Sequence, residues 1–306
     1  MLWDVHCHFP FNWENPDDPQ YEQAVDARAD ALRDAGVTRA SLLCSGRFGL
    51  THDDALTYAR RHEDLFLPSA QLDPEDTTPQ ELRRLHEIGY RGIKISGVRR
   101  PYDDYKYFPL YQTAEELQMP ILFHLGVIGG GIDYQITHPR RDPRAAQSIR
   151  RQREMAEEAR KNPGGGSPFR RGGMRDISAT RMKPFHLDTI ANNFPELRMI
   201  GAHLGGTGNY DEAASVARWR HNVYFDLSGG ETIERHAIER RIVGHEIGVE
   251  KLIWGSDCGT DEIGDHAIRL EQIFEQAKLT EDESDRIRYW NAAELFGEAE
   301  PTLAAE

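Results

Sequence analysis

The sequence contains no apolar run of eighteen or more residues, so we expect no helix that spans a membrane. Its first residues lack a basic stretch followed by an apolar one, so we expect no secretory signal and a cytoplasmic location. Cysteine is scarce as well, because only Cys7, Cys44 and Cys258 are present, an odd number with wide spacing. This pattern favours reduced thiols over a disulfide framework.

Positive charge is in deficit. The 37 Lys and Arg residues are outnumbered by 51 Asp and Glu residues, which gives a net charge of -14 at pH 7. A phosphate backbone is bound through clustered positive charge, so nucleic acid is excluded as the main partner. With neither nucleic acid nor a membrane expected, we predict a small-molecule substrate, and assembly into a homo-oligomer stays an open alternative.

Two common motifs are also missing. No Gly-x-Gly-x-x-Gly follows the first strand-like run, which argues against dinucleotide binding. No Gly-x-Ser-x-Gly is present, which argues against a hydrolase with a Ser-His-Asp triad. The chain has no internal repeats either.

Short apolar runs alternate with helical patterns along the chain. The predicted strands are residues 3–9, 39–45, 65–72, 91–97, 119–126, 197–206, 222–229 and 251–259. Helical patterns include residues 23–36, 52–63, 78–89, 108–118, 187–196 and 239–250. Eight such βα units predict an α/β protein of the (β/α)8 barrel class, the TIM barrel, with one domain over residues 1–306.

The longest interruption of this alternation follows the fifth predicted strand, over residues 129–183. Within it, residues 140–183 hold thirteen Lys or Arg and five Asp or Glu. Glycine-rich segments on both sides of a helix-like pattern over 145–161 are typical of a lid. Two interpretations stay open, a solvated insertion or a basic cover over a site for anionic substrates.

Polar residues stand late in the predicted strands. In V-H-C-H-F the alternation of a strand places His6 and His8 on one face, with Val5, Cys7 and Phe9 on the other. Four other runs carry one polar residue near their end: Lys94, His124, His203 and Asp257. The carboxyl ends of barrel strands surround one opening, so we expect these six side chains to gather there.

Imidazole and carboxylate groups are suitable ligands for Zn²⁺, Mn²⁺, Fe²⁺ or Ni²⁺, and a site with an open position is typical of catalysis. Such an ion lowers the pKa of a bound water from 15.7 to about 7. Asp257 would bind the ion and orient that water, and a remaining histidine would move protons. Asp226, late in the seventh run, is interpreted either as a support behind the ligands or as a buried hydrogen-bonding group.

Six motifs occur in order over residues 3–297: D-V-H-C-H-F, G-I-K-I, I-L-F-H-L-G, F-P-E-L-R-M-I-G-A-H-L-G-G, I-W-G-S-D-C-G and R-Y-W-N-A-A-E-L-F-G. Together they resemble the amidohydrolase superfamily. More narrowly, they are similar to the amidohydrolase-related branch that includes aminocarboxymuconate-semialdehyde decarboxylase and several lactonases.

The resemblance implies one divalent metal ion, with zinc expected and manganese, iron or nickel as alternatives. Its ligands would be His6, His8, His124 and Asp257, with His203 as the general acid and base. Some members of the superfamily carbamylate a lysine at the position of Lys94 to bridge two metals. For Lys94 we favour a contact with a substrate carboxylate, or a structural charge.

We therefore predict a metal-dependent hydrolase that acts on a small carboxylated or cyclic substrate, a lactone or an amide. Arg47, after the second strand, joins Lys94 as a predicted substrate-binding residue. Several decarboxylases of the branch replace the first histidine by glutamate, so retention of His6 favours hydrolysis. The alternatives are a metal-dependent non-oxidative decarboxylase of a muconate-like or aromatic carboxylate and, from another class, a binding module that recruits an acidic partner.

Overall fold

The computed structural model describes residues 1–10, 20–45, 50–128, 133–134, 140–161, 170–171 and 174–298 of the chain. Its eight-stranded parallel sheet contains, in spatial order, β1 (Trp3–His8), β2 (Arg39–Ser45), β3 (Phe66–Leu72), β4 (Gly92–Ile95), β5 (Ile121–Phe123), β8 (Met199–Gly201), β9 (Val223–Asp226) and β10 (Leu252–Ile253). Two hydrogen bonds join the last strand and its loop to the first, Val5 N–H to Trp254 O and Asp257 N–H to His6 O. The sheet is therefore a nearly closed barrel, and the prediction of a TIM barrel is confirmed.

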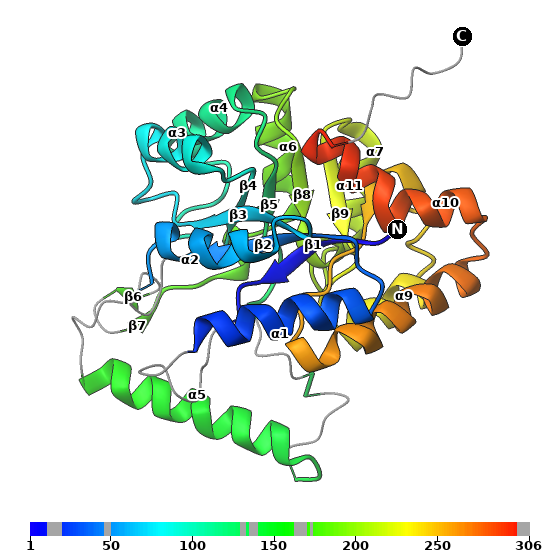
Figure 1. The fold of residues 1–306 in the computed structure, drawn as a ribbon, viewed down its shortest axis with the longest axis horizontal. Helices are drawn as coiled ribbons and strands as arrows, with labels where there is room; N and C mark the ends of the chain where they lie inside the picture. The colour runs from blue at the N-terminus through cyan, green and yellow to red at the C-terminus, as the bar shows by residue number, and fades with distance from the viewer. Residues whose placement is uncertain are drawn as a thin grey trace.

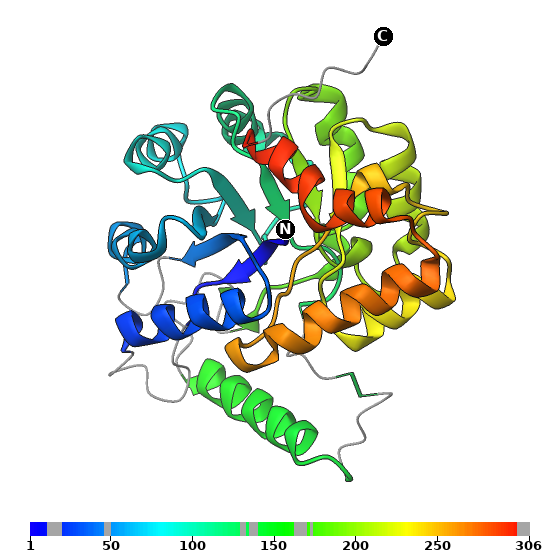
Figure 2. The ribbon, with the colours of Figure 1, turned by 45° about the vertical axis from the view of Figure 1, so that its right-hand side comes forward.

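Helices surround the strands (Figures 1 and 2). They are α1 (Tyr21–Asp34), α2 (His52–Ala59), α3 (Pro79–Ile88), α4 (Phe108–Glu116), α6 (Pro184–Asn193), α7 (Tyr210–Trp219), α8 (Glu231–Glu239), α9 (Ile263–Ala277), α10 (Glu281–Asp285) and α11 (Asn291–Phe296). Threonine hydroxyls cap three of them, because Thr51, Thr78 and Thr280 accept the N–H groups of Asp54, Glu81 and Glu283. Among the described residues, no helix is both long and apolar enough to cross a bilayer.

The prediction of a helix over residues 239–250 is wrong. α8 ends at Glu239, and the chain then makes turns around an isolated bridge between Val243 and Ile247. Arg241 and Gly244 have φ values of 53° and 72°, in the left-handed region that interrupts a right-handed helix. The apolar spacing of this segment serves packing, because Ile242, Val243 and Ile247 are buried.

Between β5 and α6 lie α5 (Pro143–Lys161) and an antiparallel pair of two-residue strands, β6 (Arg170–Arg171) and β7 (Met174–Arg175). In Figures 1 and 2, α5 lies apart from the ring of helices, on the side of α1. The glycine-rich flanks of the predicted lid fall largely on residues 129–132 and 162–169, which lie outside the described residues.

The core has two parts. The larger cluster fills the layer between strands and helices and includes Cys7 and Phe9. The smaller cluster lies inside the barrel and includes Trp3, Val5, Leu43, Leu67, Leu122, Ile200, Ile253 and, from α11, Ala292, Ala293 and Leu295. The prediction that Cys7 and Phe9 lie on the face opposite His6 and His8 is confirmed, because both pack in the larger cluster. The same prediction for Val5 is wrong, since Val5 packs inside the barrel. The register between β1 and β2 shifts between Asp4 and Cys7, which breaks the alternation.

The cysteines allow a test of this packing. Cys7 and Cys44 are fully buried, and burial raises the pKa of each of the three thiols to about 12. Because the thiolate is the reactive form, we expect almost no labelling of the native protein by a disulfide reagent at pH 8. In guanidinium chloride the same reagent should titrate three thiols. Cys258 is partly exposed and could react slowly. Rapid labelling of Cys7 or Cys44 in the native protein would contradict the packing of β1 and β2.

Candidate active site

The six strand-end side chains come together at the carboxyl end of the barrel. His6 and His8 lie at the end of β1, with their ring centroids 5.3 Å apart. The His203 ring, which follows β8, lies 5.2 Å from that of His6, and the His124 ring, which follows β5, lies 4.8 Å from that of His203. The remaining two side chains, Lys94 and Asp257, reach the same histidines.

The carboxylate of Asp257 faces three imidazoles. Its Oδ1 lies 3.1 Å from His8 Nε2 and 3.6 Å from His6 Nε2. Its Oδ2 lies 3.7 Å from His203 Nε2. His6, His8 and Asp257 form a group of ligand atoms within 4.8 Å of one another, which is close enough for one ion.

His124 approaches this group through His203. Its Nδ1 lies 3.2 Å from His203 Nε2, and its backbone is held by Ile95 O and by the hydroxyl of Tyr102. Neither of the two potential metal-binding groups found among the described residues includes His124. Its Nε2 is buried and has no hydrogen-bond partner within the described part of the chain.

Lys94 lies at the centre of the site. Its Nζ is 2.9 Å from His6 Nε2, and the side chain is only 1% exposed. Burial lowers the pKa of Lys94 to about 8. Lys94 is therefore placed beside the atom of His6 that also faces Asp257.

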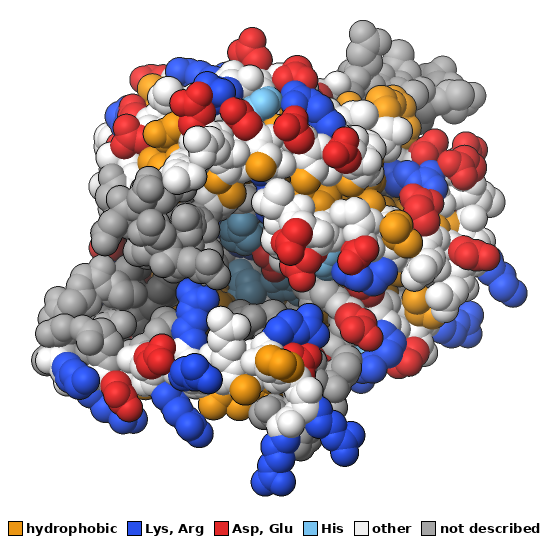
Figure 3. All heavy atoms as spheres, turned by 60° about the horizontal axis from the view of Figure 1, so that its bottom comes forward, with side chains coloured by type: hydrophobic (Ala, Val, Ile, Leu, Met, Phe, Trp, Pro, Cys, Tyr) orange, Lys and Arg blue, Asp and Glu red, His pale blue; other side chains and the backbone are white. Residues whose placement is uncertain are grey.

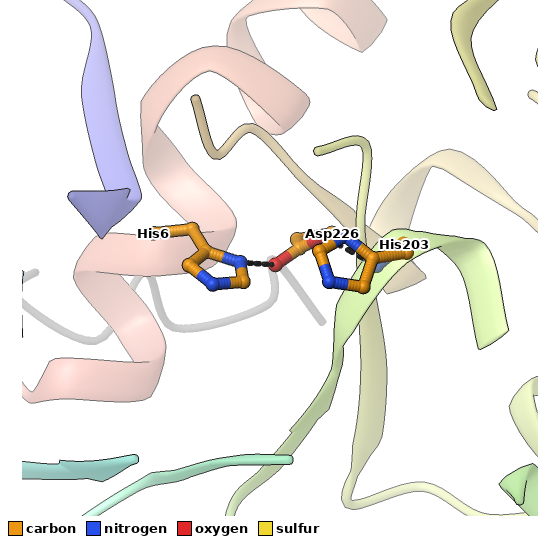
Figure 4. Close-up of side chains that lie close together, drawn as sticks. All are labelled: His6, His203 and Asp226. Atoms are coloured by element: carbon orange, nitrogen blue, oxygen red, sulfur yellow. Dashed lines mark hydrogen bonds and ion pairs between the residues drawn. The ribbon is translucent and has the colours of Figure 1, made fainter. Parts of the chain in front are cut away.

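A second carboxylate, Asp226 at the end of β9, lies between His6 and His203 (Figure 4). Its Oδ2 lies 2.8 Å from His6 Nδ1. Its Oδ1 accepts the backbone N–H of His203 at 2.8 Å and that of Ser228 at 3.1 Å, and it lies 2.6 Å from Ser228 Oγ. Burial raises the pKa of Asp226, but the charge and hydrogen bond of His6 outweigh it, so the net result is a lowered pKa.

The carboxylates of Asp226 and Asp257 differ in how far hydrogen-bond donors already occupy their oxygens. Asp226 also forms a group of potential ligands with His6 and His203. Donors already surround both of its oxygens, so Asp226 is suited to orient the histidines rather than to hold an ion. Asp257 faces imidazole nitrogens and is 26% exposed, so its group has the donors and the access of a metal site.

The protonation states of this group fit a metal ion. Burial, followed by the charge of Lys94, lowers the pKa of His6 to about 4, so its imidazole is neutral at pH 7. Burial raises the pKa of Asp257, but the charge of His6 and the hydrogen bond of His8 outweigh it and hold the pKa well below its usual range. Neutral imidazole and ionised carboxylate are the forms that ligate metals.

Two residues of the site have unusual backbone conformations. His203 has φ 61° and Asp257 has φ 48°, both in the left-handed region that non-glycine residues rarely adopt. The N–H of His203 donates to Asp226 Oδ1, and the N–H of Asp257 donates to His6 O. These bonds hold the chain in turns that aim both side chains into the opening.

Buried polar residues that sequence reasoning did not identify support the ligands from below. Asp4 is fully buried, and its Oδ1 accepts the backbone N–H of His6 and that of Ser256. Arg28 of α1, only 2% exposed, donates to Cys258 O at 2.8 Å and to His8 O at 3.4 Å. Asp4 and Arg28 thereby tie the end of β1 to the loop that carries Asp257.

The loops after β5 and β8 touch through two glycines. A Cβ added at Gly206 would lie 2.7 Å from Gly126 Cα, and one at Gly126 would lie 2.9 Å from Gly206 Cα. Both glycines have φ 83°. The contact fixes the separation of the loops that carry His124 and His203.

We expect Gly206→Ala to lower the free energy of unfolding by about 2–4 kcal/mol, because the left-handed backbone and the overlap each carry a cost. Gly208→Ala is the matched control, since Gly208 has φ 91° but nothing within 4 Å of an added Cβ. It should cost only about 1–2 kcal/mol. Urea unfolding of both variants tests this, and equal losses would contradict the contact between the two loops.

Figure 3 looks onto the opening of the barrel. Histidine side chains lie in a hollow, and Lys and Arg side chains line a segment along one side of it, where Figure 1 places α5. Arg47, predicted to bind substrate, lies outside the described residues, so its position relative to the hollow stays a prediction.

A model of the family described as amidohydrolase matches residues 3–297. Among solved structures, an uncharacterized TIM-barrel protein from Bordetella bronchiseptica is 16% identical with a TM-score of 0.63, covering 97% of this chain and 98% of that one. A probable 2-pyrone-4,6-dicarboxylic acid hydrolase from Acinetobacter baumannii, with citric acid bound, is 16% identical with a TM-score of 0.60, covering 97% and 99%.

A dihydroxybenzoic acid decarboxylase from a Polaromonas species, with manganese and the inhibitor 2-nitroresorcinol bound, is 17% identical with a TM-score of 0.58, covering 97% and 96%. These structural likenesses establish the fold alone. A comparison with curated proteins gives no match.

Proposed function

This chain belongs to the amidohydrolase family, and from that premise we propose that it is a metal-dependent hydrolase of a small carboxylated or cyclic substrate, a lactone or an amide. The observation that carries the proposal is the carboxylate of Asp257 facing the Nε2 atoms of His6, His8 and His203. Retention of His6 in the H-x-H of β1 favours hydrolysis over decarboxylation.

In this proposal His6, His8, His124 and Asp257 hold one divalent ion, with zinc expected. When bound there, the ion supplies a Lewis acid for the carbonyl and an acidified water. Asp257 would orient the attacking water, and Asp257 or His203 would accept its proton. His203 would then return that proton to the leaving oxygen or nitrogen. His124 is included in the proposed ligand set because its buried Nε2 has no hydrogen-bond partner among the described residues, while its Nδ1 lies 3.2 Å from His203 Nε2.

The substrate is proposed to be anionic. The Acinetobacter hydrolase holds citric acid, and its name specifies a dicarboxylic acid. Lys94, beside His6 in the centre of the site, is the proposed contact for a substrate carboxylate, with Arg47 as a second one.

The segment over residues 129–183 is proposed to cover the opening as a basic lid. Within it, α5 is tied to Tyr134, whose hydroxyl lies 3.2 Å from Ser148 Oγ and 3.3 Å from Gln152 Nε2. The neighbouring Asp133 contacts Thr232 of α8. These contacts connect the cover to the rim of the barrel.

One observation favours a second candidate, a non-oxidative decarboxylase. The Polaromonas decarboxylase has the same fold and holds manganese. In that reaction the same site would hold an aromatic or muconate-like carboxylate while carbon dioxide leaves.

The test starts from protein stripped by a chelator and reloaded with Zn²⁺ or Mn²⁺, with the bound metal measured by elemental analysis. Each form is assayed against lactones, carboxylated amides and aromatic carboxylates. Metal-dependent proton release from a lactone or amide supports the hydrolase, whereas metal-dependent carbon dioxide release supports the decarboxylase. A purified protein that takes up no metal and turns over none of these classes would overturn both.

A further inference from the structure

The hydroxyl of Ser228 lies between the inner nitrogens of two site histidines. Its Oγ is 2.9 Å from His203 Nδ1 and 3.0 Å from His6 Nδ1, and the side chain is fully buried. The same oxygen lies 2.6 Å from Asp226 Oδ1. The hydroxyl of Ser228 has one proton and three possible acceptors for it, His203 Nδ1, His6 Nδ1 and Asp226 Oδ1.

The hydrogen-bond network decides where that proton goes. Asp226 Oδ1 accepts two backbone N–H groups, from His203 and Ser228, so it acts as an acceptor. At 2.6 Å, its contact with Ser228 Oγ is also the shortest that this hydroxyl makes, as expected for a hydroxyl that donates to a carboxylate. Ser228 thus donates to Asp226 and presents only lone pairs to the imidazoles.

A lone pair on Ser228 Oγ requires a proton on the nitrogen that faces it. His203 Nδ1 must then carry hydrogen, because no other hydrogen-bond donor among the described residues contacts it, and His203 Nε2 is left with a lone pair. His6 reaches the same tautomer through Asp226 Oδ2, which accepts from its Nδ1 at 2.8 Å. Lys94, an ammonium donor on the other side of His6, requires a lone pair at Nε2 and agrees independently.

We propose that Ser228 is a positioning residue that holds His203 in the Nδ1–H tautomer. The Nε2 lone pair of His203 then faces His124 Nδ1 at 3.2 Å, which donates to it, and Asp257 and the reacting atoms on the open side. Asp226 accepts directly from His6 Nδ1. It acts on the His203 ring through Ser228, whose hydroxyl donates to Asp226 and accepts from His203 Nδ1. The inference deepens the proposed function and rests on it for its catalytic meaning, since it states that His203 meets the substrate as a base and becomes an acid only after taking up a proton. The tautomer itself is a property of the metal-free chain.

The experiment is ¹⁵N-detected or long-range proton–nitrogen NMR of the full-length, metal-free protein, in which protonated and unprotonated ring nitrogens are well separated. Loss of signals in His203→Gln assigns the His203 ring. The wild type should show His203 with Nδ1 protonated and Nε2 unprotonated. Ser228→Ala should shift that ring toward a mixture of tautomers, and Ser228→Thr should restore the wild-type pattern because it restores the hydroxyl.

Ser41→Ala is the matched control, because the Ser41 hydroxyl is also buried but accepts from Trp3 Nε1 and touches no imidazole. It should leave the His203 signals unchanged. A wild-type His203 protonated at Nε2, or a Ser228→Ala ring identical to that of the wild type, would overturn the inference. The wild-type spectrum alone decides the tautomer should the alanine variant not fold.

Titration with Zn²⁺ separates this inference from the proposed function. We expect Ser228→Ala to bind Zn²⁺ nearly as tightly as the wild type, because Asp226 holds the ligand His6 and His203 is not among the proposed ligands. A wild type with the expected tautomer that binds no Zn²⁺ would support the role of Ser228 and overturn the metal-dependent function. An unchanged His203 ring in Ser228→Ala would count against the role of Ser228 alone and would leave the proposed metal site intact.

Discussion

Asp257→Asn is expected to reduce turnover by more than about 100-fold, since loss of a partner behind a metal ligand already costs about 10–100-fold. The carboxylate of Asp257 faces His6, His8 and His203 within 3.1–3.7 Å. An amide has one acceptor oxygen and no charge, so it can neither bind a cation as strongly nor accept the proton of a water. The measurements are kcat/KM with the substrate found in the assay and the metal content after dialysis.

Asp265→Asn on the exposed face of α9 is the matched control and should keep both activity and metal. A thermal melt of each variant separates loss of the site from loss of the fold. Full-rate turnover by folded Asp257→Asn would remove Asp257 from the chemistry and with it the proposed mechanism.

The sequence predicted the barrel because its strands are buried on both faces and read as short apolar runs between helical patterns. It overestimated the strand ends. The runs predicted over 197–206 and 251–259 form ladders only over Met199–Gly201 and Leu252–Ile253. The residues that follow leave the sheet in left-handed turns at His203 and Asp257, which an apolar pattern does not distinguish from continued strand.

The six polar residues at the barrel mouth were detectable because each interrupts an apolar run. Their supports were not. Arg28 stands in an ordinary amphipathic pattern, where a buried guanidinium looks the same as an exposed one. Ser228 follows β9 by two residues and resembles any turn serine until the fold places it beside His6 and His203. Such roles depend on contacts between distant strands, which the spacing of residues along the chain does not encode.

Asp226→Ala is expected to lower the free energy of unfolding by about 3 kcal/mol or more. The carboxylate accepts His6 Nδ1–H and the backbone N–H groups of His203 and Ser228, all buried. A buried donor left without an acceptor costs about 1–3 kcal/mol. Alanine leaves these three without one, whereas the Ser228 hydroxyl, the fourth donor to Asp226, can turn to an imidazole. Urea unfolding measures the loss. Asp53→Ala is the control, because the Asp53 side chain lies on the exposed face of α2 and pairs there with Arg84, and its expected change is within about 1 kcal/mol.

Asp226→Asn separates stability from the orientation of the histidines. If the amide oxygen takes the place of Oδ1, it keeps the two backbone bonds, so this variant should unfold less easily than Asp226→Ala. Its amide N–H then faces His6 Nδ1, which must accept, so the proton of His6 moves to Nε2. There it blocks the lone pair beside Asp257, and the ammonium of Lys94 has to move away from Nε2 or lose a proton. We therefore expect a folded protein that binds Zn²⁺ at least roughly 10-fold more weakly, measured by competition with a chelator. Zn²⁺ binding as tight as in the wild type would contradict the role of Asp226 in orienting His6 as a ligand, because displacing a proton from Nε2 costs affinity.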